Sequence, residues 1–141
     1  MLKKHKDSHL DHSLTEDQIQ WILDSFKDRD GFLLETVTLP QELGQVPCGL
    51  YGPLMGDDPI SETEVIHERR GSRSYDSRLV NRPVRPTSQV TVIAGEHDGE
   101  SCVLFTAFGG PATPREPGDP SLPEKGRTES VEFWSTHALA R

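Results

Sequence analysis

The 141-residue sequence contains only two cysteines and no apolar run of membrane-spanning length. Two cysteines without an export signal are more typical of reduced packing residues than of a disulfide. The basic start, MLKKHKDSHLDHS, lacks the apolar centre of a secretory signal. We therefore expect a cytoplasmic protein without membrane contact.

Hydrophobic residues are scarce, at 33% of the chain with a mean hydropathy of −0.59. This composition predicts a small core and a large share of polar loop. We expect a flexible tail at 1–12 and a single domain at 13–141. Three histidines in the tail could attract a metal, but nothing around them fixes ligand geometry. We therefore expect neither a metal nor another cofactor.

Standard catalytic signatures are also missing. The sequence has no phosphate-binding glycine-rich loop, no CxxC pair, no HExxH and no nucleophile elbow. Its net charge of −8 argues against a protein that coats long DNA non-specifically. A local basic groove remains compatible with that charge.

Two segments have helical patterns. The pair Ser13-x-x-Glu16 is a capping-box pattern, and the apolar residues that follow it recur with helical spacing, which predicts a helix over 14–29. A second helix is predicted over 127–139, with Val131, Trp134 and Ala138 on one side.

The segments between the helices read mainly as strands. Val65, His67 and Arg69 alternate as in a strand, although Ser61 and Glu64 could instead cap a short helix. Asp98-Gly99 is a hairpin signal between two strongly apolar strands. Strands are expected at 32–39, 46–52, 64–69, 74–80, 89–95 and 100–110, with 82–86 as a stiff connector. The fold class expected is α+β: a mainly antiparallel sheet with an N-terminal and a C-terminal helix packed on it.

A proline-rich stretch precedes the second helix. Its prolines stand at 111, 114, 117, 120 and 123, the three-residue period of a polyproline II helix. The stretch could be a ligand for a proline-recognising domain. We favour a stiff connector laid over the protein's own surface. Glu116 and Arg115 in it could border a cleft or pair with each other.

The most unusual feature is the segment 67–86, which holds six arginines and no lysine. Its charge is +4, from six arginines against Glu68 and Asp76, so the remaining 121 residues sum to −12. A guanidinium grips phosphate or carboxylate with two parallel hydrogen bonds. If 64–69 is extended, His67 shares a face with Arg69, and arginines from the next strand could flank the same surface.

A histidine, several arginines and a hydroxyl such as that of Thr106 or Tyr75 can together cleave a phosphodiester without metal. The opposing interpretation is that the arginines pair with the surplus carboxylates and form a solvated, salt-bridged face. For any single arginine this second interpretation is favoured. For the whole cluster both stay open.

The segment EVIHERR (64–70), the arginine-rich strand after it and LFTAFGGP (104–111) resemble the barnase–EndoU–colicin–RelE group of small ribonuclease toxins. The resemblance covers about residues 60–111. It implies an N-terminal helix before an antiparallel sheet, and a metal-free active site scattered over that sheet. It assigns catalysis to His67, Arg73 and Thr106, and phosphate binding to Arg69, Arg70 and Arg78. The acidity of the chain and the region after Pro111 depart from the pattern.

The leading hypothesis is thus a metal-independent, toxin-type ribonuclease that binds RNA phosphates through an arginine-rich sheet face. The alternative is a non-enzymatic binding module for an acidic protein or a nucleotide. An acidic immunity or antitoxin-type protein is a third hypothesis. These hypotheses differ in whether His67, Thr106 and the arginines converge in one cleft. The sequence does not determine the oligomeric state.

Overall fold

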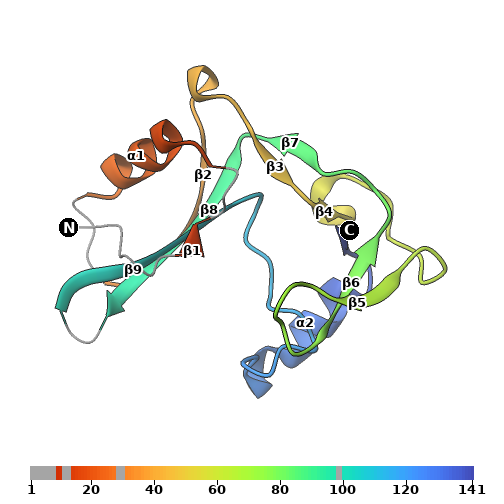
Figure 1. Cartoon of the computed structure of the whole chain (residues 1–141). Helices are drawn as coiled ribbons and strands as arrows, with labels where there is room; N and C mark the ends of the chain where they lie inside the picture. The colour runs from red at the N-terminus through yellow and green to blue at the C-terminus, as the bar shows by residue number, and fades with distance from the viewer. Residues whose placement is uncertain (1–8, 11–13, 28–30, 98–99) are drawn as a thin grey trace. The chain divides into compact units, whose positions relative to one another are not determined.

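The computed structural model describes residues 9–10, 14–27, 31–97 and 100–141. Its contacts divide the chain into two compact units (Figure 1). Unit 1 comprises residues 1–48 and 86–112, and unit 2 comprises residues 49–85 and 113–141. Each unit is described below by itself. The single domain expected over 13–141 stays a prediction.

Unit 1 contains a four-stranded sheet in the order β1-β9-β8-β2. Its strands are β1 (His9–Leu10), β2 (Leu33–Thr38), β8 (Gln89–His97) and β9 (Glu100–Gly109). β8 is antiparallel to both of its neighbours, which confirms the expected β8–β9 pairing. The turn at Asp98-Gly99 lies outside the described residues. β1 falls within the expected tail and pairs in parallel with β9, whereas 1–8 and 11–12 are not described.

Helix α1 (Glu16–Ser25) covers the core of unit 1. The capping box is formed by Thr15 and Gln18, two positions later than the predicted pair: the Thr15 hydroxyl accepts from the Gln18 amide at 3.1 Å, and Gln18 Oε1 accepts from the Thr15 amide at 2.9 Å. The helix is therefore shorter than the predicted 14–29. Ile22 and Phe26 are buried in one cluster with the valines of β8, as the helical spacing predicted.

Unit 2 contains a second four-stranded sheet, in the order β4-β10-β6-β5. Its strands are β4 (Leu50–Tyr51), β5 (Ile66–Arg69), β6 (Asp76–Val80) and β10 (Ala138–Ala140). β5 and β6 are antiparallel and run side by side in Figure 1. β10 is parallel to β6 and antiparallel to β4. The core is small: Tyr51, Ile60, Val80, Ala138 and Ala140, with Val65 packed against them.

Helix α2 (Arg127–Trp134) is five residues shorter than the predicted 127–139. The chain turns after Trp134, and Ala138 lies in strand β10 between two neighbouring strands. Val131 was expected on the buried side but is 50% exposed, while Trp134 is 4% exposed. The prediction was wrong here because three small or apolar residues are compatible with the helical period and with the strand period. Pairing with β4 and β6, which are distant in sequence, makes this segment a strand.

The remaining elements are short. β3 (Val46–Cys48) and β7 (Arg85–Thr87) form a two-stranded sheet, so the predicted connector 82–86 ends in a strand. Three 3-10 turns cover Gln41–Leu43, Pro53–Met55 and Glu124–Gly126. The class is α+β with mainly antiparallel strands, one helix towards each end of the chain, as expected. Among the described residues, no helix has the length and apolarity needed to cross a membrane.

Candidate functional site

The register of β5 and β6 places the histidine and two of the predicted site arginines on one face. His67 pairs with Arg78, and Arg69 pairs with Asp76. Directly paired residues point to the same side of a sheet, so His67, Arg69 and Arg78 share a face; the alternation predicted this for His67 and Arg69. Thr106 lies on β9 in unit 1, whereas His67 lies in unit 2. These two residues are therefore not brought together within one compact unit.

Arg78 is buried, and every nitrogen of its guanidinium has an acceptor. Nε donates to the His137 carbonyl at 2.9 Å, and Nη2 donates to the carbonyls of Ile60 at 3.0 Å and Ser135 at 3.2 Å. Nη1 donates to the carboxylate of Glu62. Burial lowers the pKa of Arg78. This side chain joins β6 to a loop and to the end of α2, and four of its five N–H groups are used, so it cannot grip a phosphate with two parallel hydrogen bonds.

Arg73 is held by Glu116. Its Nη1 donates to Oε2 of Glu116 at 2.9 Å, and its guanidinium lies 5.8 Å from the ring centre of Tyr75. The Tyr75 hydroxyl is 3.5 Å from the same carboxylate oxygen. Burial is the main reason why the pKa of Tyr75 is raised. Arg73 thus neutralises a carboxylate of its own unit.

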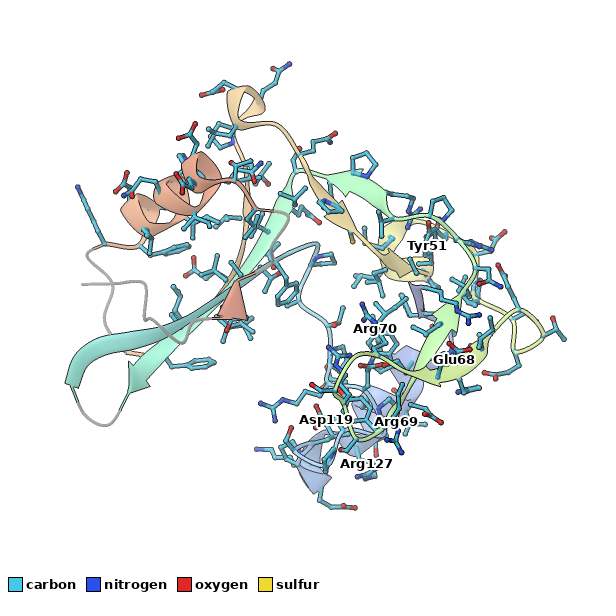
Figure 2. The ribbon with its side chains drawn as sticks, in the orientation of Figure 1. Tyr51, Glu68, Arg69, Arg70, Asp119 and Arg127 are labelled. Carbon is cyan, nitrogen blue, oxygen red and sulfur yellow. The ribbon has the colours of Figure 1, made fainter. Side chains whose placement is uncertain are left out.

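Two further arginines of the segment bind carboxylates and stack on one aromatic ring, that of Tyr51, which is labelled in Figure 2. Arg82 contacts both oxygens of Glu64, at 2.7 and 3.0 Å, and Arg85 contacts both oxygens of Asp57, at 2.8 and 2.9 Å. Their guanidiniums lie 5.2 and 4.1 Å from the ring centre of Tyr51. Hydrogen bonds from Arg85 are the main reason why the pKa of Asp57 is lowered. These paired, stacked guanidiniums fasten loops around a small core.

Arg69 and Arg70 differ from the other four. Both side chains are exposed, and neither forms a hydrogen bond or ion pair with any residue that the structure describes. Four of the six arginines therefore neutralise carboxylates within unit 2, as the salt-bridge interpretation proposed. Arg69 and Arg70 are the two that stay available to a ligand.

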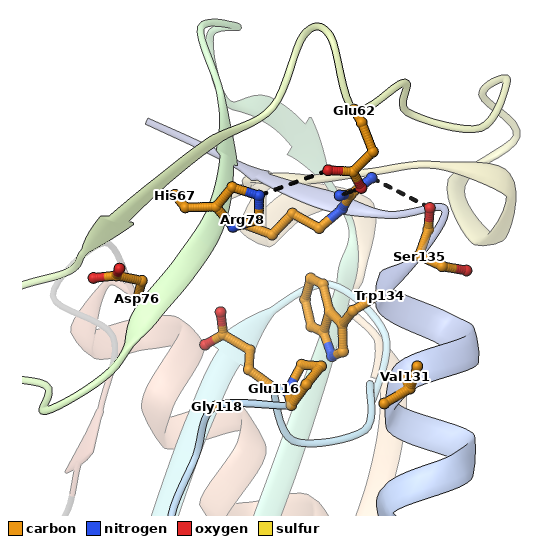
Figure 3. A pocket seen from close by; sticks show the side chains of 10 residues that line it. Glu62, His67, Asp76, Arg78, Glu116, Gly118, Val131, Trp134 and Ser135 are labelled. Atoms are coloured by element: carbon orange, nitrogen blue, oxygen red, sulfur yellow. Dashed lines mark hydrogen bonds and ion pairs between the residues drawn. The ribbon is translucent and has the colours of Figure 1, made fainter.

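A cavity of about 350 Å³ lies on the His67 face of unit 2 (Figure 3). β5 and β6 contribute one wall, α2 another, and the loop at 116–118 a third. It contains three carboxylates. Its lining residues are Glu62, His67, Asp76, Arg78, Glu116, Pro117, Gly118, Val131, Trp134 and Ser135.

The loop wall of the cavity is fixed to α2 by two hydrogen bonds. Trp134 Nε1 donates to the carbonyl of Pro114 at 3.1 Å, and the buried Ser130 hydroxyl donates to the carbonyl of Arg115 at 2.6 Å. This part of the proline-rich stretch therefore lies on its own unit, as expected of a connector. Because these contacts set the loop in place, Glu116 follows at a defined position beside Trp134.

Glu116 is 8% exposed, and only one of its oxygens is satisfied. Oε2 accepts from Arg73, whereas Oε1 has no hydrogen-bond partner among the described residues and is itself buried. A buried carboxylate oxygen without a donor is costly and usually marks an absent partner. In Figure 3 this carboxylate points towards the strand that carries Asp76 and Arg78.

His67 lines the same cavity but is far more exposed than Glu116. Its side chain is 59% exposed, and Nε2 is 3.7 Å from a Glu62 oxygen. Glu62 thus stands between His67 and the buried guanidinium of Arg78. The histidine has access to both the cavity and the solvent.

Of the site residues predicted from the sequence, His67 and Arg78 line this cavity, whereas most of its other lining residues were not predicted. From the sequence, Glu116 was expected to border a cleft or to pair with Arg115. The cleft is present, whereas the ion-pair partner is Arg73, and Arg115 donates to Ser121. The sequence offered no pattern that would predict Glu62 and Asp76 as cavity residues, because isolated acidic residues are common in an acidic chain.

Unit 1 has a second cavity of about 450 Å³, lined by Leu39, Gln41, Gly44, Gln45 and Ser88. None of these side chains is ionisable. Within the described ranges, no group of three or more His, Cys, Asp or Glu residues is arranged to hold a metal ion. The cavity of unit 2 is therefore the site with the richer chemistry.

No protein-family model matches this chain, and no curated protein or solved structure is significantly similar to it.

Proposed function

We propose that unit 2 is a non-enzymatic binding module and that the cavity between His67 and Glu116 receives its ligand. The observation that carries the proposal is the buried Glu116 carboxylate, whose Oε1 has no partner in the described structure. A ligand that donates a hydrogen bond there offsets the cost of its burial. The cavity volume of about 350 Å³ suits a small organic group or one large side chain.

Three features favour binding over RNA cleavage. Three carboxylates line the cavity, so a phosphate entering it meets like charge. Arg78, assigned to phosphate binding, and Arg73, assigned to catalysis, already bind Glu62 and Glu116. Thr106 belongs to the other compact unit. The ribonuclease hypothesis stays a prediction, supported by the exposed His67 and by Arg69 and Arg70, which have no partner among the described residues.

The proposal is tested with fragments of three charge classes. In a Trp21→Phe background, Trp134 is the one remaining tryptophan of the chain and lies in the cavity wall. Its indole resonance and fluorescence therefore report on the site. We expect a subset of cationic, neutral or anionic fragments to shift the Trp134 signal and to reach saturation. If fragments of all three classes leave the signal unchanged, the proposal is wrong.

A cleavage assay separates the two functions. The full chain is incubated with structured and unstructured RNA in EDTA, alongside the His67→Ala variant. The binding proposal predicts that neither protein cleaves. Cleavage by the wild type that disappears in His67→Ala would instead support the ribonuclease hypothesis.

A further inference from the structure

The charges in the cavity restrict what can enter it. Glu62, Asp76 and Glu116 are acidic, and Arg78 is the one arginine among the lining residues. Four of the five N–H groups of Arg78 already have acceptors, so it offers at most one Nη1 N–H to a ligand. Opposite charges attract more strongly in a partly buried site than in water. The cavity therefore favours a cation over an anion.

Two of the carboxylates have acceptor capacity left. Glu116 Oε1 has no partner among the described residues, although Arg73 occupies Oε2. The exposed Asp76 carboxylate forms no ion pair with any described residue, even with Arg69 opposite it on β5. A carboxylate has about four lone-pair sites, so Glu116 can accept from a second donor while it keeps Arg73. A ligand with several N–H groups matches these oxygens.

The remaining wall is apolar. Trp134 is buried, while Val131 beside it is 50% exposed on the same helix. Both line the cavity (Figure 3). Pro117 lines it as well. An indole favours a planar cation or an aliphatic stem packed against it. An apolar wall facing carboxylates is a pattern suited to a group with a charged head and a short hydrocarbon stem.

We propose, resting on the binding function above, that the cavity takes a guanidinium group carried on an aliphatic stem. Its N–H groups donate to Glu116 and Asp76, and its stem packs against Trp134. Guanidinium is preferred to ammonium because its planar fork donates to two carboxylates at once and stacks on an indole. The group can come from an arginine side chain of a partner protein or from a free small guanidine.

The first test compares two probes of the same shape. N-acetyl-arginine amide and N-acetyl-citrulline amide differ in one group, which is charged in the first and neutral in the second. Titrated against the Trp134 signal, the arginine probe should bind at least about tenfold more tightly than the citrulline probe. It should lose affinity as salt is raised. Equal binding of both probes, or tighter binding of inorganic phosphate, would overturn the inference.

The second test removes one acceptor at a time. Glu116→Gln and Asp76→Asn should each weaken the arginine probe by about fivefold or more, in line with the loss of a charge-assisted hydrogen bond. Glu129→Gln is the matched control, because Glu129 is exposed on α2 and does not line the cavity. Circular dichroism and thermal melting identify a variant that fails to fold. Asp76 is exposed, so Asp76→Asn should fold; unchanged affinity in this variant contradicts the role assigned to Asp76.

A third arm identifies the source of the guanidinium. Butylguanidinium carries the head and stem alone, whereas the peptide Gly-Arg-Gly adds a backbone. Tighter binding of the peptide assigns the site to a protein partner, and tighter binding of butylguanidinium assigns it to a small guanidine. If fragments bind but neither guanidine does, this inference fails while the binding function survives. If no fragment binds, both fail.

Discussion

The guanidinium of Arg73 contacts one oxygen of Glu116 at 2.9 Å, while the other oxygen of that buried carboxylate has no partner among the described residues. This half-satisfied pair connects the arginine-rich segment to the cavity. The arginine holds the carboxylate in place and neutralises part of its charge. The remaining oxygen is the acceptor to which the proposed ligand donates a hydrogen bond.

Removing the arginine of this pair should destabilise unit 2. In Arg73→Met, Glu116 keeps its charge but loses its cation, so we expect a loss of about 1–2 kcal/mol, limited by the exposure of Arg73. The double variant Arg73→Met, Glu116→Gln should recover part of that loss. The free energy of unfolding of each variant is measured by urea unfolding in the Trp21→Phe background, with Trp134 fluorescence as the signal. Additive effects in the double variant would show that the two side chains are not coupled.

Arg78 should be far more sensitive than Arg70, although both belong to the same segment. Arg78→Met removes the donor to the carbonyls of Ile60, Ser135 and His137, and we expect a loss of about 3–5 kcal/mol. Arg78→Lys should not restore stability, because an ammonium lacks the planar fork.

Arg70→Met is the matched control for Arg78. It should change the free energy of unfolding by less than about 0.5 kcal/mol, because its side chain is exposed and unpaired in the described structure. Equal losses in Arg70→Met and Arg78→Met would contradict the structural role of Arg78.

Gly52 should tolerate no side chain. A Cβ there would overlap the His137 ring, and its φ of 139° is unfavourable for other residues. The ring is fixed, since its Nε2 accepts from the Leu54 amide at 2.8 Å. We expect Gly52→Ala to cost several kcal/mol, about 3 or more when overpacking and backbone strain add.

Gly56 provides the control for that clash. Its φ is 83°, but no atom lies within 4 Å of the point that a Cβ would occupy. Gly56→Ala should therefore cost only about 1–2 kcal/mol from backbone strain. The difference between the two variants, measured by thermal melting, isolates the contact with His137. A difference near zero would mean that the ring moves aside.

Acid should weaken the contact between Asp57 and Arg85. The pKa of Asp57 is lowered in the folded state, so its contribution is fully present above its unfolded pKa near 4 and is lost as the pH falls through its lower folded pKa. Asp57→Asn should therefore be less stable than wild type at pH 7 by about 1 kcal/mol, the scale of a charge-assisted hydrogen bond that is partly exposed.

The same variant should approach wild-type stability once the pH falls below the lowered folded-state pKa of Asp57, where the carboxyl group is protonated. Urea unfolding at both pH values measures the difference. Asp119 also has a lowered pKa, through hydrogen bonds from Ser121. Because Asp119 is present in both the wild type and the variant, it does not contribute to the difference between them. A difference that stays constant with pH would contradict the linkage to Asp57.

Local patterns predicted the elements whose signal is periodic. The apolar spacing of Ile22 and Phe26 located α1, and the continuous apolar strands before and after Asp98-Gly99 predicted the β8–β9 pairing. The alternation around His67 correctly placed it on the same face as Arg69. In each case residues close in sequence carry the information, because helix and strand periods act over a few positions.

Patterns failed where distant partners decided. Ala138–Ala140 became a strand because β4 and β6 supply its hydrogen bonds, although the local sequence continues a helical spacing. The cap was also ambiguous from the sequence: Thr15 and Gln18 form a capping box, whereas the predicted Ser13 lies outside the described residues. A short stretch of sequence does not specify which distant residues will pair with it.

The sequence by itself determined the α+β class, the acidic charge and the concentration of arginine between His67 and Pro86. Only the tertiary structure decided what that arginine does. It buries Arg78 among backbone carbonyls, pairs Arg73 with Glu116 and leaves Arg69 and Arg70 unpaired among the described residues. The physical reason is that a guanidinium binds whichever acceptor the fold brings within reach, and these acceptors are separated from it by 16 to 59 residues.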